Sequence, residues 1–271
     1  MNVEEFLGAE QQPDGSWVFH LGKELNGAFG GVNGGVLTAA SLLAARSLAE
    51  GRRPTSIDSR YLRGVTPGAA RVHADLVHEG RTLSCVSIDI FDERDRLCTR
   101  STATFVTPEA LADLDDEGQA GVPEGWKAIE DGRLWAQPGG DRAIPLIDTF
   151  QPTGIGRDER GVATAIRIPW DEGQSSAEAA CIAADISVGP PVARVTGGRP
   201  IPTPNPDLSL RFCAEVTLPG HLTGAARLDR VANGVATTRI EVRSALELVA
   251  TGISTTTMLG GAWPNASKKP K

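Results

Sequence analysis

Two segments of the chain are apolar around the whole circumference of the helices that they predict. The first begins at Asn33, a residue type that caps helix N-termini, and continues through Gly34, Gly35 and residues 36–45 without a charged side chain. The second, residues 179–184, is equally free of charge. A helix on the surface keeps one polar face, so a helix without such a face must be enclosed by other elements. The sequence therefore predicts two buried central helices.

The second of these helices has a predicted beginning and end. Ser175 and Glu178 stand at the spacing of a capping box, in which an N-cap side chain pairs with a residue three positions later. Gly189, Pro190 and Pro191 follow. Because proline lacks the backbone N–H that a helix uses, these residues predict that the helix ends there.

Strand patterns follow each helix. Val86, Ile88 and Ile90 occupy every second position in the first half, and Ile240 and Val242 do the same in the second half. This period of two is typical of strands with one buried face. Turns that contain glycine, proline or asparagine separate the strands. The sequence therefore predicts two antiparallel meanders, one after each helix.

The two halves share a pattern that indicates an internal repeat. Arg60 and Tyr61 are matched by Arg211 and Phe212 at an offset of 151 residues. An acidic segment rich in glycine and proline separates the copies, as expected for a connector. We predict four parts: an N-terminal repeat (residues 1–106), an acidic connector (residues 107–142), a C-terminal repeat (residues 143–260) and a flexible tail (residues 261–271).

Charge and composition exclude several functions. Asp and Glu outnumber Lys and Arg by 34 to 27, and the net charge of −7 argues against nucleic acid as a partner. No stretch has the roughly 20 strongly apolar residues that a bilayer requires, and the N-terminus lacks the features of a leader. We expect a cytoplasmic protein with no membrane partner. The four cysteines form no C-x-x-C pair, which argues against a zinc site.

Several segments resemble those of thioesterases of the acyl-CoA thioesterase II type. They are Phe29-Gly30-Gly31, residues 56–63 with residues 80–82, and residues 206–212 with residues 248–250. The resemblance implies the double hotdog of the thioesterase-like superfamily, an α+β fold of two fused repeats, each with a long antiparallel sheet wrapped around a central helix. It also implies hydrolysis of acyl thioesters, with acyl-CoA as substrate and fatty acid metabolism as the setting.

The start of the first helix is suited to that chemistry. Gly34 and Gly35 leave backbone N–H groups without Cβ cover at the positive end of a helix dipole, where an oxyanion is stabilised. Tight packing against a neighbouring element would equally require small residues. Asn33 either orients the thioester or caps the helix. We also assign Tyr61 to the substrate-binding site.

Asp207 is the candidate general base. It precedes an alternating strand, and the resemblance implies that it activates the attacking water. A turn carboxylate that accepts hydrogen bonds from nearby N–H groups is the alternative. The family's water-binding glutamine falls on or near Ser254. We therefore expect Ser254 to assist catalysis and Thr255 to contribute to substrate binding.

Asp185 is a second carboxylate of interest, because it lies near the end of an otherwise apolar helix. A buried carboxylate needs partners or acquires a raised pKa, which can mark a functional site. A position at a helix end that reaches solvent would explain it as well.

The sequence lacks the residues that other hydrolytic and hydratase mechanisms require. The chain has no G-x-S-x-G nucleophile motif, and no aspartate stands five residues before a histidine, which is the pair used by hotdog hydratases. We therefore predict a thioester hydrolase without a metal or redox cofactor, for which a homo-oligomer is possible but not needed to build the site. The alternative is a noncatalytic hotdog protein that binds acyl thioesters or lipid-like ligands.

Overall fold

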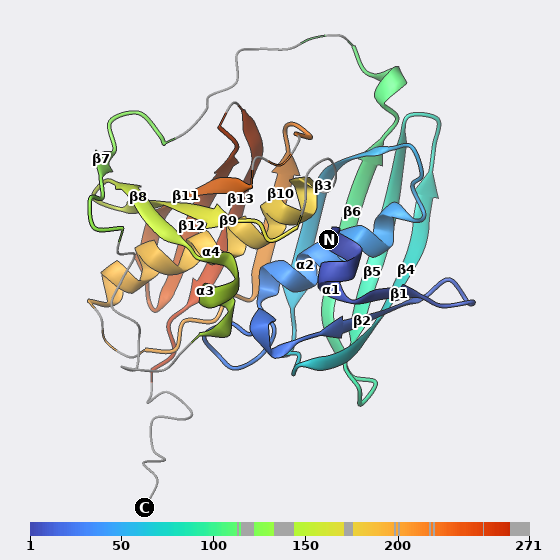
Figure 1. Cartoon of the computed structure of the whole chain (residues 1–271), viewed down its shortest axis with the longest axis horizontal. Helices are drawn as coiled ribbons and strands as arrows, with labels where there is room; N and C mark the ends of the chain where they lie inside the picture. The colour runs from blue at the N-terminus through green and yellow to red at the C-terminus, as the bar shows by residue number, and fades with distance from the viewer. Residues whose placement is uncertain are drawn as a thin grey trace, which may run out of the picture.

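A computed structural model describes most of the chain (Figure 1). The described residues are 1–112, 114, 122–132, 144–170, 176–197, 199, 201–216, 218, 220–245 and 247–260. The expected tail at residues 261–271 lies outside them, as does much of the expected connector at residues 107–142. The three boundaries between the four predicted parts therefore stay predictions.

A single antiparallel sheet of 13 strands forms the frame of the described chain. Its order is β1-β2-β4-β5-β6-β3-β10-β13-β12-β11-β9-β8-β7. The strands of the first half are β1 (Ala9–Gln11), β2 (Trp17–Leu21), β3 (Arg53–Tyr61), β4 (Gly68–Glu79), β5 (Leu83–Phe91) and β6 (Leu97–Val106). Those that follow are β7 (Lys127–Ala128), β8 (Thr153–Arg157), β9 (Gly161–Arg167), β10 (Asp207–Phe212), β11 (His221–Ala232), β12 (Val235–Arg243) and β13 (Leu248–Thr257).

The part of the chain that the structure describes holds few helices. Two are long, α2 (Gly34–Arg46) and α4 (Ser176–Thr196), and the others are α1 (Val3–Leu7), α3 (Pro145–Phe150) and the 3-10 turns η1 (Lys23–Leu25) and η2 (Pro108–Ala110). Within the described ranges no helix has the length and apolar character needed to cross a membrane.

The two repeats meet where β3 pairs with β10. The register places Asp207 opposite Arg60, Ser209 opposite Asp58 and Arg211 opposite Ser56. The offset of 151 residues relates Ser56 to Asp207 and Arg60 to Arg211, so it maps the first of these pairs onto the last. The two strands are therefore related by a local two-fold arrangement. The expected double hotdog, with two sheets joined into one antiparallel surface, is confirmed.

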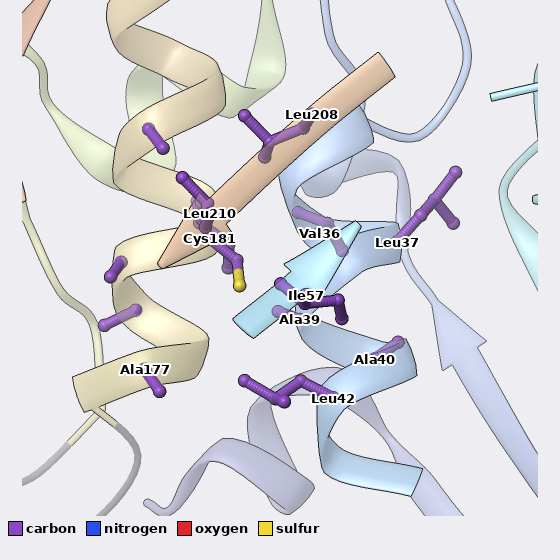
Figure 2. Packing of buried hydrophobic residues seen from close by; sticks show 14 of the residues in the cluster. Val36, Leu37, Ala39, Ala40, Leu42, Ile57, Ala177, Cys181, Leu208 and Leu210 are labelled. Carbon is purple, nitrogen blue, oxygen red and sulfur yellow. The ribbon is translucent and has the colours of Figure 1, made fainter. Parts of the chain in front are cut away.

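Both long helices lie on the same face of the sheet, side by side (Figure 1). Their uncharged segments, residues 36–45 of α2 and residues 179–184 of α4, are buried throughout, as the absence of a polar face predicted. Figure 2 shows side chains of α2, α4, β3 and β10 gathered in one cluster, among them Val36, Cys181, Ile57 and Leu208. The core therefore runs continuously through both repeats.

The predicted end of α4 is wrong. The helix continues through Pro190 and Pro191 to Thr196, and both prolines are buried. A proline inside a helix costs about 3 kcal/mol, mainly through the lost hydrogen bond, and burial of apolar surface outweighs that local preference here. The predicted cap residue Ser175 lies outside the described residues. Asp185 consequently lies near the middle of α4 rather than near its end.

The helices α2 and α4 touch through a glycine. A Cβ atom built on Gly35 would lie 2.6 Å from the carbonyl oxygen of Cys181 and 2.8 Å from the Cα of Ile182. Only a residue without a side chain allows the two backbones to come so close. Tight packing against a neighbouring element was one expected reason for these glycines. At Gly35 this packing is present, and the neighbouring element is α4.

We expect Gly35→Ala to lower the free energy of unfolding by about 1–3 kcal/mol, because the added methyl group forces the two helices apart. Urea denaturation followed by tryptophan fluorescence measures this change. Gly64→Ala is the matched control, since a Cβ there meets no atom within 4 Å, and its effect is expected to stay within about 0.5 kcal/mol. Equal stability of both variants would contradict the contact.

Candidate active site

A cavity of about 830 Å³ opens beside the start of α2. Its walls come from both repeats: the N-terminus of α2, the end of β3, the second half of α4, α3 and the segment that precedes β10. Most of the lining is apolar, and a few polar side chains converge on one region, namely Asn33, Tyr61, Asp185, Asn205 and Thr256. A mostly apolar cavity with few convergent polar groups is typical of a small-molecule site.

Among the described residues that line this cavity, Asp185 is the one with a carboxylate. One carboxylate oxygen accepts a hydrogen bond from Asn33 Nδ2 at 2.6 Å, and the other accepts one from Asn205 Nδ2 at 3.4 Å. The backbone N–H of Gly35 is a further donor. The residue is 8% exposed, and burial raises the pKa of Asp185 although the three donors oppose that shift. The buried-carboxylate interpretation of Asp185 therefore fits the structure better than a helix end open to solvent.

Asn33 has two roles in this arrangement. Its side-chain oxygen accepts a hydrogen bond from the backbone N–H of Val36 at 3.3 Å and so caps α2. Its side-chain nitrogen donates to Asp185. The cap therefore also orients the carboxylate.

Asn205 and Thr256 extend the polar group toward β13. Thr256 Oγ1 donates to Asn205 Oδ1 at 2.8 Å, and Asn205 in turn donates to Asp185. Both residues line the cavity. The sequence analysis missed them, although one signal was available: residues two apart on a strand share a face, so Thr256 lies on the same face as Ser254.

The two glycines of the predicted oxyanion site differ in their surroundings. The N–H of Gly35 points to Asp185, whereas Gly34 lines the cavity and its N–H donates to no described residue. A Cβ on Gly34 would lie 2.7 Å from the ring of Tyr61. Gly34 therefore combines a free amide at the positive end of α2 with the absence of a side chain that would displace Tyr61.

Tyr61 closes this side of the cavity from the end of β3. Its hydroxyl lies 2.7 Å from Thr38 Oγ1. Burial raises the pKa of Tyr61 well above its usual value, and the nearby Asp185 raises it further. The phenol is therefore neutral at physiological pH.

The structure does not bring Asp207 to the cavity. Leu208 and Leu210 are buried beneath the helices, and the alternation of β10 places Asp207 on the opposite face of the sheet. There its carboxylate accepts a hydrogen bond from the Thr255 N–H at 2.7 Å and pairs with Arg60 at 3.3 Å.

Ser254 and Thr255 also do not line the cavity. Ser254 is fully buried, and its hydroxyl donates to the backbone oxygen of Asp207 at 2.8 Å. Thr255 lies on the same side of β13 as the Asp207 carboxylate that its N–H contacts. The catalytic assignment of Asp207 and Ser254, and the binding assignment of Thr255, stay predictions that this geometry does not favour.

The chain is similar to known proteins in sequence and in fold. Residues 25–106 match the family model described as the acyl-CoA thioesterase N-terminal domain. A search of curated proteins gives no match.

Solved structures extend the likeness to nearly the whole chain. A TesB protein of Mycobacterium avium subsp. paratuberculosis is 18% identical, with a TM-score of 0.73 over 94% of this chain and 97% of that one. The acyl-CoA thioesterase II TesB2 of Mycobacterium marinum is 14% identical, with a TM-score of 0.70 over 96% and 99%. A hot dog fold protein of unknown function from Alicyclobacillus acidocaldarius is 18% identical, with a TM-score of 0.75 over 97% and 100%.

The fold and the cavity between its repeats therefore define a double hotdog protein. Within that class, the chain is similar to the acyl-CoA thioesterase II proteins of the thioesterase-like superfamily, by sequence in its N-terminal repeat and by fold along almost its whole length. These similarities support acyl thioester hydrolysis as the general activity.

The raised pKa of Asp185 predicts a pH-dependent stability. Ionisation of this buried group destabilises the folded protein, whereas below its unfolded pKa of about 3.8 the carboxyl is protonated in both states. As the pH rises from about 4 to 8, we expect the free energy of unfolding of Asp185→Asn to increase relative to that of wild type, because only wild type must ionise the buried group. Denaturation at several pH values measures this. A pH-independent difference would mean that Asp185 titrates alike in both states, because any lost hydrogen bond contributes equally at each pH.

Proposed function

We propose that the protein hydrolyses acyl thioesters, with an acyl-CoA as substrate, and that Asp185 activates the attacking water. The observation that carries this proposal is the position of Asp185: a buried carboxylate of raised pKa on the wall of an apolar cavity, next to the free amide of Gly34. A base and an oxyanion donor within one water-poor site are the two groups that acyl transfer to water requires.

The residues suggest a simple reaction course. The thioester carbonyl accepts a hydrogen bond from the Gly34 N–H, where the dipole of α2 stabilises the developing oxyanion. Asp185 takes a proton from water as the water oxygen attacks the carbonyl carbon. The tetrahedral intermediate then collapses, the carbon–sulfur bond breaks, and the proton passes from Asp185 to the departing thiolate. The products are a free acid and a thiol.

Asn33, Asn205 and Thr256 position the base. Asn33 and Asn205 donate to different oxygens of the carboxylate, and Thr256 holds Asn205. This polar group takes the place of the family's water-binding glutamine, whose position falls on or near Ser254 in this chain. Its presence favours a hydrolase over the alternative of a noncatalytic ligand-binding protein.

The cavity is suited to a substrate with an apolar tail and an anionic head. Leu37, Ile186 and Val192 belong to its apolar lining, while Arg63 and Arg199 contribute positive charge. An acyl chain buries its methylene groups in the first region, and phosphates interact with guanidinium groups such as those in the second.

We expect Asp185→Asn to lower kcat/KM by at least about 100-fold, the usual contribution of a general base. Release of free thiol from a panel of acyl-CoA substrates measures the rate. Asp207→Asn is the matched control, since its carboxylate lies on the other face of the sheet, and it is expected to retain activity close to that of wild type.

The same experiment discriminates between the alternatives. Loss of turnover in Asp207→Asn with normal turnover in Asp185→Asn would identify Asp207 as the base. Tight binding of acyl-CoA by the wild-type protein without thiol release would support the noncatalytic ligand-binding protein.

A further inference from the structure

Tyr61 lies at the end of a chain of buried hydroxyl groups that runs from the cavity into the core. Its hydroxyl is 2.7 Å from Thr38 Oγ1, which is 3.0 Å from Ser59 Oγ. Ser59 Oγ is 2.8 Å from Ser101 Oγ, which is 3.2 Å from Ser41 Oγ. Thr38 and Ser41 belong to α2, Ser59 and Tyr61 to β3 and Ser101 to β6, so the chain joins the helix to the sheet.

One backbone carbonyl determines the direction of every bond in this chain. Ser41 Oγ donates to the Leu37 carbonyl at 3.0 Å, and a carbonyl can only accept. Ser101 donates to Ser41, so its single hydrogen is not available to Ser59, and Ser59 must donate to Ser101. By the same reasoning Thr38 donates to Ser59.

Tyr61 must therefore donate its hydroxyl hydrogen to Thr38, whose own hydrogen is already used. The raised pKa of Tyr61 keeps that hydrogen on the oxygen. A tyrosine hydroxyl has one hydrogen and can also accept. Since Tyr61 lines the cavity, its oxygen presents only acceptor capacity there.

The position of this oxygen relates it to the substrate. A Cβ built on Gly34 would lie 3.1 Å from the Tyr61 hydroxyl oxygen, so the hydroxyl stands beside the residue whose amide faces the thioester carbonyl in our proposed function. A substrate group that meets Tyr61 is thus close to the thioester itself.

We propose that Tyr61 is a specificity-determining residue that selects substrates carrying a hydrogen-bond donor close to the thioester carbonyl. Two parts of an acyl-CoA supply such a donor: a hydroxyl group on the acyl chain near the carbonyl, and the amide N–H of the pantetheine arm nearest the sulfur. A carbonyl or other acceptor at the same place meets the lone pairs of Tyr61 and is disfavoured. This inference rests on the proposed function only for the placement of the thioester.

Binding of non-hydrolysable thioethers tests the proposal without relying on turnover. One pair of S-alkyl-CoA analogues differs only in a hydroxyl group on the third carbon of the alkyl chain. A second pair, S-alkyl-N-acetylcysteamine and a dialkyl sulfide of equal length, differs in the amide. Titration calorimetry gives the dissociation constant of each analogue for wild type and Tyr61→Phe.

We expect Tyr61→Phe to weaken binding of a donor-bearing analogue by about 3- to 10-fold, the usual effect of one neutral hydrogen bond, and to leave its donor-free partner unchanged. An effect in the first pair identifies the acyl hydroxyl as the donor, and an effect in the second pair identifies the pantetheine amide. An equal effect on both members of each pair, or no effect in either pair, overturns the proposal.

Ser41→Ala tests the direction of the chain from a distance. Ser41 is fully buried and does not line the cavity, but without its hydroxyl the chain is no longer tied to the Leu37 carbonyl and can reverse. We expect this variant to lose part of the preference for the donor-bearing analogue. Ser187→Ala is the matched control, since Ser187 makes the same bond to a carbonyl four residues earlier in α4 but is not part of the chain.

The two proposals fail in different ways. Donor-dependent binding without thiol release would overturn the proposed hydrolysis and leave the role of Tyr61 intact. Normal hydrolysis with equal binding of all analogue pairs would do the reverse. A preference that persists undiminished in Ser41→Ala, with Ser187→Ala unchanged, would overturn the role of the hydroxyl chain in setting it.

Discussion

The contact between the N-terminus of α2 and the middle of α4 is the interaction on which the site depends. Gly35 allows the two backbones to approach, and the approach brings the Asp185 carboxylate to the positive end of the α2 dipole. Burial disfavours the charge, and donors from Asn33, Asn205 and Gly35 partly compensate. A buried carboxylate with this balance is ionisable but basic, which is the combination that a general base requires.

The same pair of helices is also joined at the other end of α2. Arg46, in its last turn, donates through Nε to Oε1 of the fully buried Glu178 at 2.5 Å and through Nη2 to Glu215 at 2.9 Å. A cation in the last turn of α2 and an anion in the first turn of α4 both complement the helix dipoles. Removal of one partner from a buried pair leaves an uncompensated charge, so this group constrains how α2 and α4 are placed and thereby the geometry at Gly35.

The parts of the structure that depend on local patterns were predictable. Asn33 as the cap of α2, the enclosure of both helices and the alternating strands around Val86 and Ile240 all follow from spacing along the chain. The continuation of α4 through two prolines was not predictable, since it depends on burial by distant residues.

The site was predictable only in part for the same reason. Asp185, Asn205 and Thr256 come from three separate elements, and only the folded chain brings them together. That Asp207 lies outside the cavity could nevertheless have been predicted from the sequence. Two inward-facing leucines at alternate positions after it place its side chain on the outer face of the sheet.

The joining of two copies in one chain has a chemical consequence. The offset of 151 residues that relates β3 to β10 also relates Gly34 to Asp185, and it carries the last residue of α2 to within one residue of the end of α4. Corresponding positions thus hold Gly34, where a Cβ would lie 2.7 Å from the ring of Tyr61, and Asp185, a buried and hydrogen-bonded carboxylate. Two identical subunits would carry the same amino acid at both places, whereas two repeats in one chain can hold different residues there.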